Sequence, residues 1–260
     1  MATSLTDEYR EAADRVPDLP PPDRTALFLD FDGTLVDLAE TPQGVSVPAD
    51  LDLLLSDLAR ATSGALAIVS GRSVEQILGF LPGYAGVIAG GHGAETFRNG
   101  ETRLHPLAGS PEVADAIRRA HAFAGSDDRL LVEEKPSGVV LHYRRAPDRA
   151  GAVLEEMQAI VTGSDALVVA RAKMAVEIRP ADASKDRAVA RLAAEAPFAD
   201  REGWVFGDDD TDEDAMRWML EQGGRAVKIG EGESAAPHRL PGPDAVRSLL
   251  RRWVDREGGR

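Results

Sequence analysis

Short apolar runs alternate with helical patterns along most of the chain, and this alternation constrains the fold more than any other feature. Strand-like runs at 26–32, 64–72, 86–95 and 203–210 are each followed by a helical pattern or a glycine-rich loop. Such runs are typical of strands buried on both faces of a parallel sheet, with the connecting helices covering those faces. The sequence therefore predicts an α/β protein with a Rossmann-like, doubly wound parallel sheet core.

The alternation changes in the middle of the chain, between about 107 and 178. There a helical segment and two strand-like segments are followed by a second helix and two more strands. This order predicts an inserted α+β (αββαββ) cap domain. We expect three parts: an N-terminal helix and linker at 1–23, a core formed by 24–108 and 180–260, and the cap domain at 109–179.

Composition excludes several classes of function. The 260 residues carry a formal net charge of −14, which argues against non-specific binding to nucleic acid or to anionic lipid. The absence of cysteine excludes disulfides, iron–sulfur clusters and thiolate zinc sites. The acidic N-terminus lacks an apolar signal region, and no stretch is apolar for long enough to cross a bilayer. We therefore expect a cytoplasmic protein.

Two aspartates, Asp30 and Asp32, end the first apolar run immediately before a Gly-Thr pair. In an extended strand this spacing puts both side chains on one side. Two like charges about 4 Å apart repel by roughly 4 kcal/mol at an effective dielectric constant near 20. A turn needs only one of these aspartates, so turn formation alone does not explain the pair. We expect a bound cation to offset the repulsion.

A second acidic cluster, GDDDTDED, follows the apolar run at 203–207. Some of its carboxylates could simply be charges at the N-terminus of a helix. However, the carboxyl ends of parallel strands meet at one edge of a sheet, where ligands bind. Carboxylates that converge there with Asp30 would repel strongly unless a divalent cation lies among them. A ligand set made only of oxygen atoms favours Mg²⁺.

Two further residues are suited to binding an oxyanion. Ser70 ends the second apolar run, and Lys185 lies where a helix is predicted to begin. The lysine ammonium and the helix N-terminus could therefore both face a phosphate. A lone serine or lysine at such a position more often has a structural role than a catalytic one. The series of aspartate, serine, lysine and acidic loop, in that order along the chain, is what indicates phosphoryl transfer.

These four motifs, DFDGT, the serine of SGR, the lysine of SKD and GDDDTD, resemble those of the haloacid dehalogenase superfamily of phosphatases. The resemblance implies that Asp30 is the nucleophile and forms an aspartyl-phosphate. It implies that Asp32 is the acid/base, which protonates the leaving alkoxide and then activates water. Ser70 and Lys185 would neutralise the phosphoryl oxygens.

The same resemblance implies a Mg²⁺ site. The ligands would be the carboxylate of Asp30, the backbone carbonyl of Asp32 and the carboxylate of Asp208, which leaves the Asp32 side chain free to move a proton. Asp209 and Asp212 would lie beyond these ligands and order the loop.

Other segments, AGGHGAE, VEEK…LHYR and VEIRP…SK, resemble the trehalose-6-phosphate phosphatases within this superfamily. The resemblance implies Mg²⁺-dependent hydrolysis of trehalose 6-phosphate to trehalose and phosphate. Charged side chains can bind the hydroxyl groups of a disaccharide through paired hydrogen bonds. The candidate substrate-binding residues are Arg72, His92, Gly93 and Glu95 in the core, and Glu133, Lys135 and Glu177 in the cap. Without the resemblance, Glu133 and Lys135 would be interpreted as a solvated face of the cap sheet.

Two alternatives stay open. One is a phosphatase of another sugar phosphate, such as sucrose 6-phosphate or mannosylglycerate phosphate. The other is a non-enzymatic, receiver-like module that binds phosphate, although such modules are shorter and lack an aspartate at the position of Asp32. For the enzyme we expect a sugar phosphate as the small-molecule partner, no nucleic acid or membrane partner, a monomer, and a pathway link to a trehalose-phosphate synthase.

Overall fold

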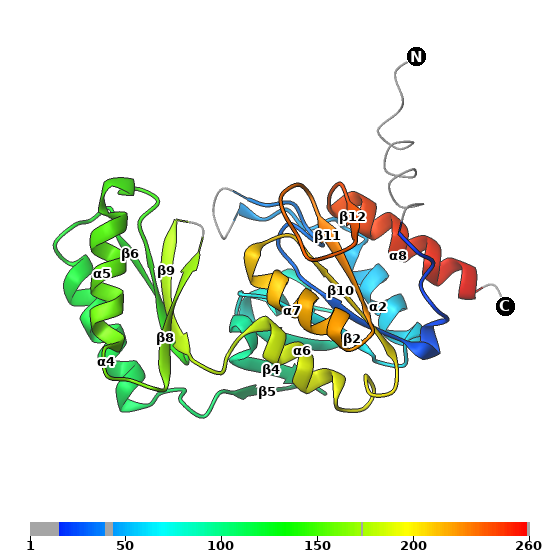
Figure 1. The fold of residues 1–260 in the computed structure, drawn as a ribbon, viewed down its shortest axis with the longest axis horizontal. Helices are drawn as coiled ribbons and strands as arrows, with labels where there is room; N and C mark the ends of the chain where they lie inside the picture. Colours follow the sequence, from blue (N-terminus) through cyan, green and yellow to red (C-terminus); the bar gives the residue numbers. More distant parts are fainter. Residues whose placement is uncertain (1–15, 40–43, 173, 259–260) are drawn as a thin grey trace, which may run out of the picture. The chain divides into compact units, whose positions relative to one another are not determined.

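The computed structural model describes residues 16–39, 44–172 and 174–258, which fall into two compact units (Figure 1). The first unit extends to Thr102 and resumes at Ser184, and the second unit is Arg103–Ala183. The second unit therefore contains the whole segment for which we predict the cap domain. The predicted N-terminal helix lies in residues 1–15, outside the described residues.

The first unit is built on a sheet that has eight strands in the described part of the chain, in the order β12-β11-β10-β1-β2-β3-β4-β5. Neighbouring strands from β12 to β3 are parallel, whereas β4 pairs antiparallel with β3. The strands are β1 Thr25–Leu29, β2 Leu66–Val69, β3 Val87–Gly90, β4 Glu95–Arg98, β5 Glu101–Leu104, β10 Glu202–Gly207, β11 Arg225–Ile229 and β12 His238–Leu240. The predicted parallel core is confirmed.

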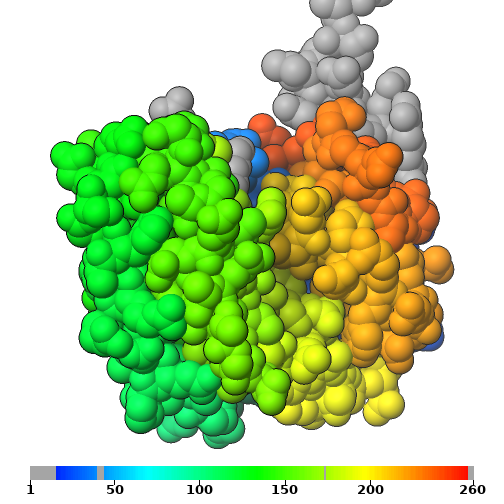
Figure 2. Space-filling view, turned by 60° about the vertical axis from the view of Figure 1, so that its left-hand side comes forward, coloured from blue at the N-terminus to red at the C-terminus, as the bar shows by residue number. Residues whose placement is uncertain are grey.

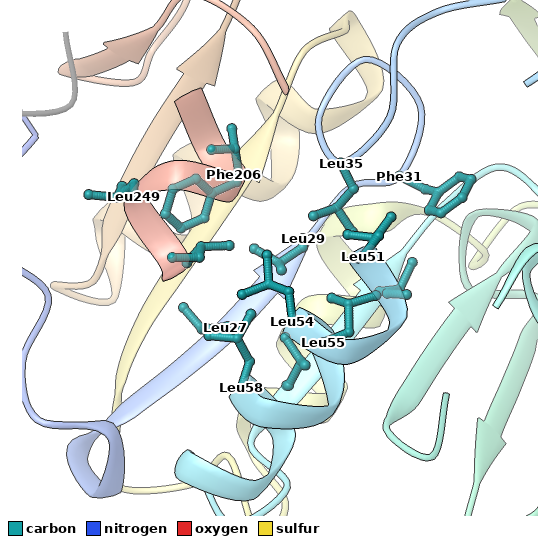
Figure 3. Packing of buried hydrophobic residues seen from close by; sticks show 14 of the residues in the cluster. Leu27, Leu29, Phe31, Leu35, Leu51, Leu54, Leu55, Leu58, Phe206 and Leu249 are labelled. Atoms are coloured by element: carbon teal, nitrogen blue, oxygen red, sulfur yellow. The ribbon is translucent and has the colours of Figure 1, made fainter. Parts of the chain in front are cut away.

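Helices cover both faces of this sheet because the strands bury apolar side chains on both faces. Leu27 and Leu29 of β1 pack in one core cluster, and Ala26 and Phe28 pack in another. Figure 3 shows the two β1 leucines facing the leucines of α2. The first cluster includes α2 Leu51–Ala61, α3 Val74–Phe80 and α8 Pro243–Gly258, and the second includes α6 Lys185–Ala193 and α7 Asp210–Glu221.

The helices α6 and α7 are amphipathic, and this orients them on the sheet. Ala188 and Leu192 of α6 and Met216 of α7 are buried in the second cluster, whereas Arg187 and Arg217 are exposed. The outer sides of both helices form part of the surface drawn in yellow and orange in Figure 2. The N-terminus of α7 comes directly after β10, at the edge of the sheet where the parallel strands end.

The second unit has an antiparallel sheet with four strands in the described residues, in the order β6-β7-β9-β8. Its two helices pack on one face of this sheet, where they bury an apolar cluster (Figure 1). The elements are α4 Pro111–Ala124, β6 Leu131–Lys135, β7 Gly138–His142, α5 Ala150–Val161, β8 Leu167–Ala172 and β9 Ala175–Pro180. The predicted αββαββ order is confirmed.

Short 3-10 helices complete the described structure: η1 Pro22–Arg24, η3 Gly91–Gly93 and η4 Pro147–Arg149. Among the described residues, no helix has both the length and the apolar character needed to span a membrane.

Candidate active site

Two neighbouring parallel strands end in the aspartates that the sequence singles out. Strand β1 ends at Leu29 and is followed by Asp30, and β10 ends at Gly207 and is followed by Asp208. The two strands are in register at their ends, and the backbone amide of Asp30 donates a hydrogen bond to the carbonyl oxygen of Phe206. Adjacent strands therefore place Asp30 and Asp208 at the same edge of the sheet.

The carboxylates of Asp30, Asp208 and Asp212 form a cluster. One oxygen from each lies within 4.8 Å of the others. Gly33 makes room for this cluster, because a Cβ atom at that position would lie 2.1 Å from Asp208 Oδ2. Gly33 also has φ +78°, a conformation that glycine adopts without strain. The Gly of the DFDGT motif is thus required both by its backbone and by the approach of Asp208.

Lys185, the first residue of α6, joins this cluster. Its ammonium donates to Asp30 Oδ1 at 2.7 Å and to Asp212 Oδ1 at 2.8 Å. The side chain is only 4% exposed. Burial opposes the charge of the ammonium, but the two carboxylates raise the pKa of Lys185 above its usual value. Lys185 is therefore held as a cation between two buried aspartates.

The aspartates respond to burial and to one another. Burial raises the pKa of Asp30 well above its usual value; Asp212 and Asp208 act in the same direction, and Lys185 opposes them. Burial, with Asp212 and Asp209, raises the pKa of Asp208 to about 6. A divalent cation among these groups would lower both pKa values. The cluster supplies only carboxylate oxygens, which are the ligands that suit Mg²⁺.

Asp32 differs from the expectation for an extended strand. Because β1 ends at Leu29, Asp32 lies beyond the strand and forms an isolated parallel bridge with Val36. Its carboxylate accepts two hydrogen bonds from Arg72, from Nε at 2.6 Å and from Nη2 at 2.8 Å. The Arg72 guanidinium lies over the ring of Phe80 at 5.0 Å. Two side-chain cations, one for each aspartate, therefore help to offset the repulsion: Lys185 pairs with Asp30, and Arg72 pairs with Asp32. The roles predicted for Asp32, metal binding through its carbonyl oxygen and proton transfer through its side chain, stay predictions.

Ser70 lies in a tightly packed loop at the end of β2. Its Oγ accepts a hydrogen bond from the backbone amide of Arg72, and its carbonyl oxygen accepts one from the amide of His92. His92 has φ +54°, which is uncommon for a residue other than glycine. Its imidazole lies so close to Gly71 that a Cβ atom there would be 2.6 Å from His92 Nε2. The structure thus brings Ser70, Arg72 and His92 together.

Gly93 and Glu95 have clear structural contacts. A Cβ atom at Gly93 would lie 2.8 Å from the Cβ atom of Ala188, so this glycine allows the loop to approach α6. Glu95 is buried, and its Oε2 accepts a hydrogen bond from the backbone amide of Val74 at the start of α3. These contacts attach the loop to α6 and α3, and the role of both residues in sugar binding stays a prediction.

Asp209 and Asp212 have different positions at the start of α7. Asp209 is the N-cap, and its carboxylate accepts a hydrogen bond from the backbone amide of Thr211. Asp212 Oδ2 accepts from the amides of both Asp208 and Asp209, each at 3.2 Å. Asp212 therefore orders the acidic loop while its other oxygen binds Lys185.

The three charged residues predicted for sugar binding in the second unit share one face of its sheet. Glu133 and Glu177 are both register partners of Val140, and Lys135 lies two residues from Glu133. The ammonium of Lys135 donates to Glu177 Oε1 at 2.7 Å. Glu133 lies 2.8 Å from a ring nitrogen of His142, and this hydrogen bond holds the pKa of Glu133 below its usual value. This face is opposite the one that the helices cover.

Comparisons with known proteins agree with these motifs. The family model described as trehalose-phosphatase matches residues 28–242. The chain belongs to the trehalose-phosphatase family. A probable trehalose-phosphate phosphatase of Sinorhizobium fredii is 38% identical over 88% of this chain and 87% of its own length. The trehalose-6-phosphate phosphatase of Escherichia coli is 36% identical over 86% of this chain and 85% of its own length.

Solved structures agree with the family and with the fold. A trehalose-6-phosphate phosphatase related protein has a TM-score of 0.72 at 25% identity, over 90% of this chain and 99% of that protein. A haloacid dehalogenase-like hydrolase of B. subtilis has a TM-score of 0.62 at 15% identity, over 88% of this chain and 99% of its own. The second likeness shows the fold alone.

Two contacts of this trehalose-phosphatase family member were not predicted. One is the pairing of Arg72 with Asp32, and the other is a buried Lys228, whose ammonium donates to the backbone carbonyl of Asp208 at 2.6 Å. The signal for Lys228 is a single charged residue within the apolar run RAVKIG. A buried lysine needs partners, but the sequence does not indicate which partners they are.

Proposed function

We propose that this chain is a Mg²⁺-dependent phosphatase that hydrolyses trehalose 6-phosphate to trehalose and phosphate. One observation carries the proposal: Asp30, Lys185, Asp208 and Asp212 converge at one edge of the sheet in a chain that belongs to the trehalose-phosphatase family. Membership of that family favours an enzyme over a receiver-like module.

In the first step, a carboxylate oxygen of Asp30 attacks the phosphorus atom of the substrate. The bond from phosphorus to the oxygen of the sugar breaks, and an aspartyl-phosphate forms. For this step Asp32 must be in its protonated form, and it becomes a carboxylate when it gives its proton to the departing alkoxide. Lys185, already hydrogen-bonded to Asp30, and the hydroxyl of Ser70 stabilise the phosphoryl oxygens.

In the second step, Asp32 removes a proton from a water molecule, and the water oxygen attacks the phosphorus atom. The bond between phosphorus and Asp30 breaks, which releases phosphate and restores the Asp30 carboxylate. The two hydrogen bonds from Arg72 orient the Asp32 carboxylate for this removal of a proton from water.

Mg²⁺ would be held by the carboxylates of Asp30 and Asp208 and by the backbone carbonyl of Asp32. When bound, it would neutralise charge on the phosphoryl group and polarise its oxygens. Asp212 orders the loop that carries Asp208, which supports its assignment beyond the ligands. Asp209, as the helix N-cap, would act on loop structure.

The face of the second unit's sheet that its helices do not cover would bind the disaccharide. Lys135 is hydrogen-bonded to Glu177, and Glu133 is hydrogen-bonded to His142. These residues would therefore offer oriented donors and acceptors to sugar hydroxyls. In the first unit, the candidate substrate-binding residues are Arg72, His92, Gly93 and Glu95. We also propose a cytoplasmic monomer that uses the product of a trehalose-phosphate synthase.

The test is a measurement of phosphate release from a panel of sugar phosphates. The panel contains trehalose 6-phosphate, sucrose 6-phosphate, glucose 6-phosphate and mannosylglycerate phosphate, each with Mg²⁺ and with EDTA. We expect the highest kcat/KM for trehalose 6-phosphate, and loss of activity in EDTA. Equal or faster turnover of another member of the panel would contradict the proposed substrate.

A matched pair of variants tests the chemistry. Asp32→Asn removes the proposed acid/base, whereas Asp37→Asn removes an exposed carboxylate from the same segment. We expect Asp32→Asn to lower kcat by about 10²–10⁴-fold with an unchanged circular dichroism spectrum, and Asp37→Asn to behave as the unmodified chain. Near-normal activity of Asp32→Asn would refute the assigned role.

A further inference from the structure

Lys228 is a charged residue in an apolar strand. It lies in β11, between Val227 and Ile229 of the first core cluster, and it is only 3% exposed. Its side chain is on the opposite face from these neighbours, the face that α7 covers. Burying an ammonium is costly unless it has hydrogen-bonding partners, so the contacts of Lys228 indicate what it does.

The ammonium of Lys228 has two partners in the described structure. It donates to the backbone carbonyl oxygen of Asp208 at 2.6 Å and lies 3.5 Å from Glu213 Oε1. The other oxygen of Glu213 accepts a hydrogen bond from the backbone amide of Ala235. Burial alone would raise the pKa of Glu213, but the Ala235 amide, the hydroxyl of Ser234 and the charge of Lys228 hold it below its usual value. Glu213 therefore directs the ammonium of Lys228 at Asp208.

The contact with Lys228 completes the anchoring of the Asp208 backbone. The amide of Asp208 donates to Asp212 Oδ2, and its carbonyl oxygen accepts from Lys228. The next amide, that of Asp209, belongs to the same peptide plane as this carbonyl and also donates to Asp212. Both peptide planes that flank the Cα atom of Asp208 are thus held, and these planes fix the direction of its Cβ atom.

The Asp208 side chain has little room to change direction. Its carboxylate lies against Gly33, where even a methyl group would collide with it, and within 4.8 Å of the Asp30 and Asp212 carboxylates. A small rotation of the backbone at Asp208 would move the carboxylate out of this cluster. A group that holds this backbone acts on the cluster without touching the substrate.

We propose that Lys228 is a positioning residue, which holds the backbone of Asp208 so that its carboxylate is aimed at the bound divalent cation. This inference rests on the proposed function, in which Asp208 binds that cation. Removing the ammonium should weaken cation binding, since the carboxylate would then sample other directions. It should leave the affinity for the substrate unchanged once the cation is saturating.

The test is direct cation binding by the full chain without substrate. Mg²⁺ binding is measured by isothermal titration calorimetry, and Mn²⁺ binding by electron paramagnetic resonance. We expect Lys228→Met to bind both cations about tenfold more weakly and Asp208→Asn to bind neither. The control is Arg225→Met. It removes a cation from the same strand, one that pairs with Glu202 near the surface. This control should bind as the unmodified chain does.

Kinetics supply a second readout that a purely structural role would not move. In Lys228→Met, the Mg²⁺ concentration for half-maximal activity should rise about tenfold, while KM at saturating Mg²⁺ stays within twofold. If Lys228→Met does not fold, Lys228→Gln keeps a neutral donor and should show a smaller weakening in the same direction. Failure of both variants to fold would overturn the proposal, because Lys228 would then be required by the fold as a whole.

The outcomes separate the two proposals. If the unmodified chain binds neither cation, the proposed metal site fails. If the unmodified chain binds them and Lys228→Met binds them equally well, the metal site stands and the positioning role of Lys228 is refuted.

Discussion

Replacing Lys185 with methionine would test how the buried acidic cluster is stabilised. Methionine fills much of the same volume but removes the ammonium between Asp30 and Asp212. At an effective dielectric constant of about 20, opposite charges 2.8 Å apart attract by roughly 6 kcal/mol. Like charges at 4.8 Å, the upper limit for the oxygens of this cluster, repel by roughly 3.5 kcal/mol. The carboxylates would take up protons rather than bear the whole of this loss.

The expected net loss is that of a broken buried ion pair, about 3–5 kcal/mol. For a protein of this size, about 1 kcal/mol corresponds to roughly 2–4 °C in Tm. We therefore expect Lys185→Met to lower the Tm of the first unit by about 10 °C in EDTA at neutral pH. Mg²⁺ should recover part of this loss, because a divalent cation restores positive charge among the same carboxylates.

The assay is thermal unfolding followed by circular dichroism, in EDTA and in saturating Mg²⁺. The control is Arg60→Met, which removes an exposed cation that pairs with Asp57 at 3.1 Å. Exposed pairs contribute about 0–1 kcal/mol, so the control should change Tm little. If Lys185→Met unfolds at the same temperature as Arg60→Met in EDTA, the claim that Lys185 neutralises the cluster is wrong.

Three further results are expected. Gly33→Ala should abolish Mg²⁺ binding, because its Cβ atom would displace Asp208, and calorimetry measures this loss. The left-handed backbone at this position should also lower the free energy of unfolding by roughly 1–2 kcal/mol, which urea unfolding measures. The control is Gly79→Ala, whose Cβ atom meets no neighbour within 4 Å. Burial raises the pKa of Asp208 to about 6, so the folded chain holds this proton more tightly than the unfolded chain does. The free energy of unfolding in EDTA should therefore fall as pH rises from about 4 through 6. Mg²⁺ should lessen that fall, and Tm values measured across this pH range check both expectations. Glu133→Gln should raise KM about tenfold with little change in kcat, whereas Glu134→Gln, an exposed neighbour that pairs with His121, should change neither.

The fold was predictable where burial leaves a pattern in the sequence. Strand β1 is buried on both faces, so its sequence is an apolar run. The helix that follows it, α2, has leucines at helical spacing. Strand β5 could not be predicted in this way, because all four of its residues are exposed and most are polar. It extends the sheet through pairing beside β4, and backbone pairing at a sheet edge leaves no hydrophobic signal.

The candidate site was predictable where a residue follows a strand or begins a helix. Asp30 and Asp208 follow strands and Lys185 begins α6, so chain order and strand direction were enough to bring them together. The partners of Arg72 and Lys228 were not predictable. Arg72 is 40 residues from Asp32, and Lys228 is 20 residues from the carbonyl oxygen that it binds. Such pairs depend on how loops close, which spacing along the sequence does not encode.

The charges at the site determine when an anionic substrate can bind. The inner groups are four carboxylates and two cations: Asp30, Asp32, Asp208, Asp212, Lys185 and Arg72. With every carboxylate ionised, these groups sum to a formal charge of −2, in a chain whose net charge is already −14. Both cations are engaged by the aspartates, so a phosphate dianion would approach an unfavourable field. A divalent cation brings the sum to zero, and the substrate should therefore bind after the cation or together with it.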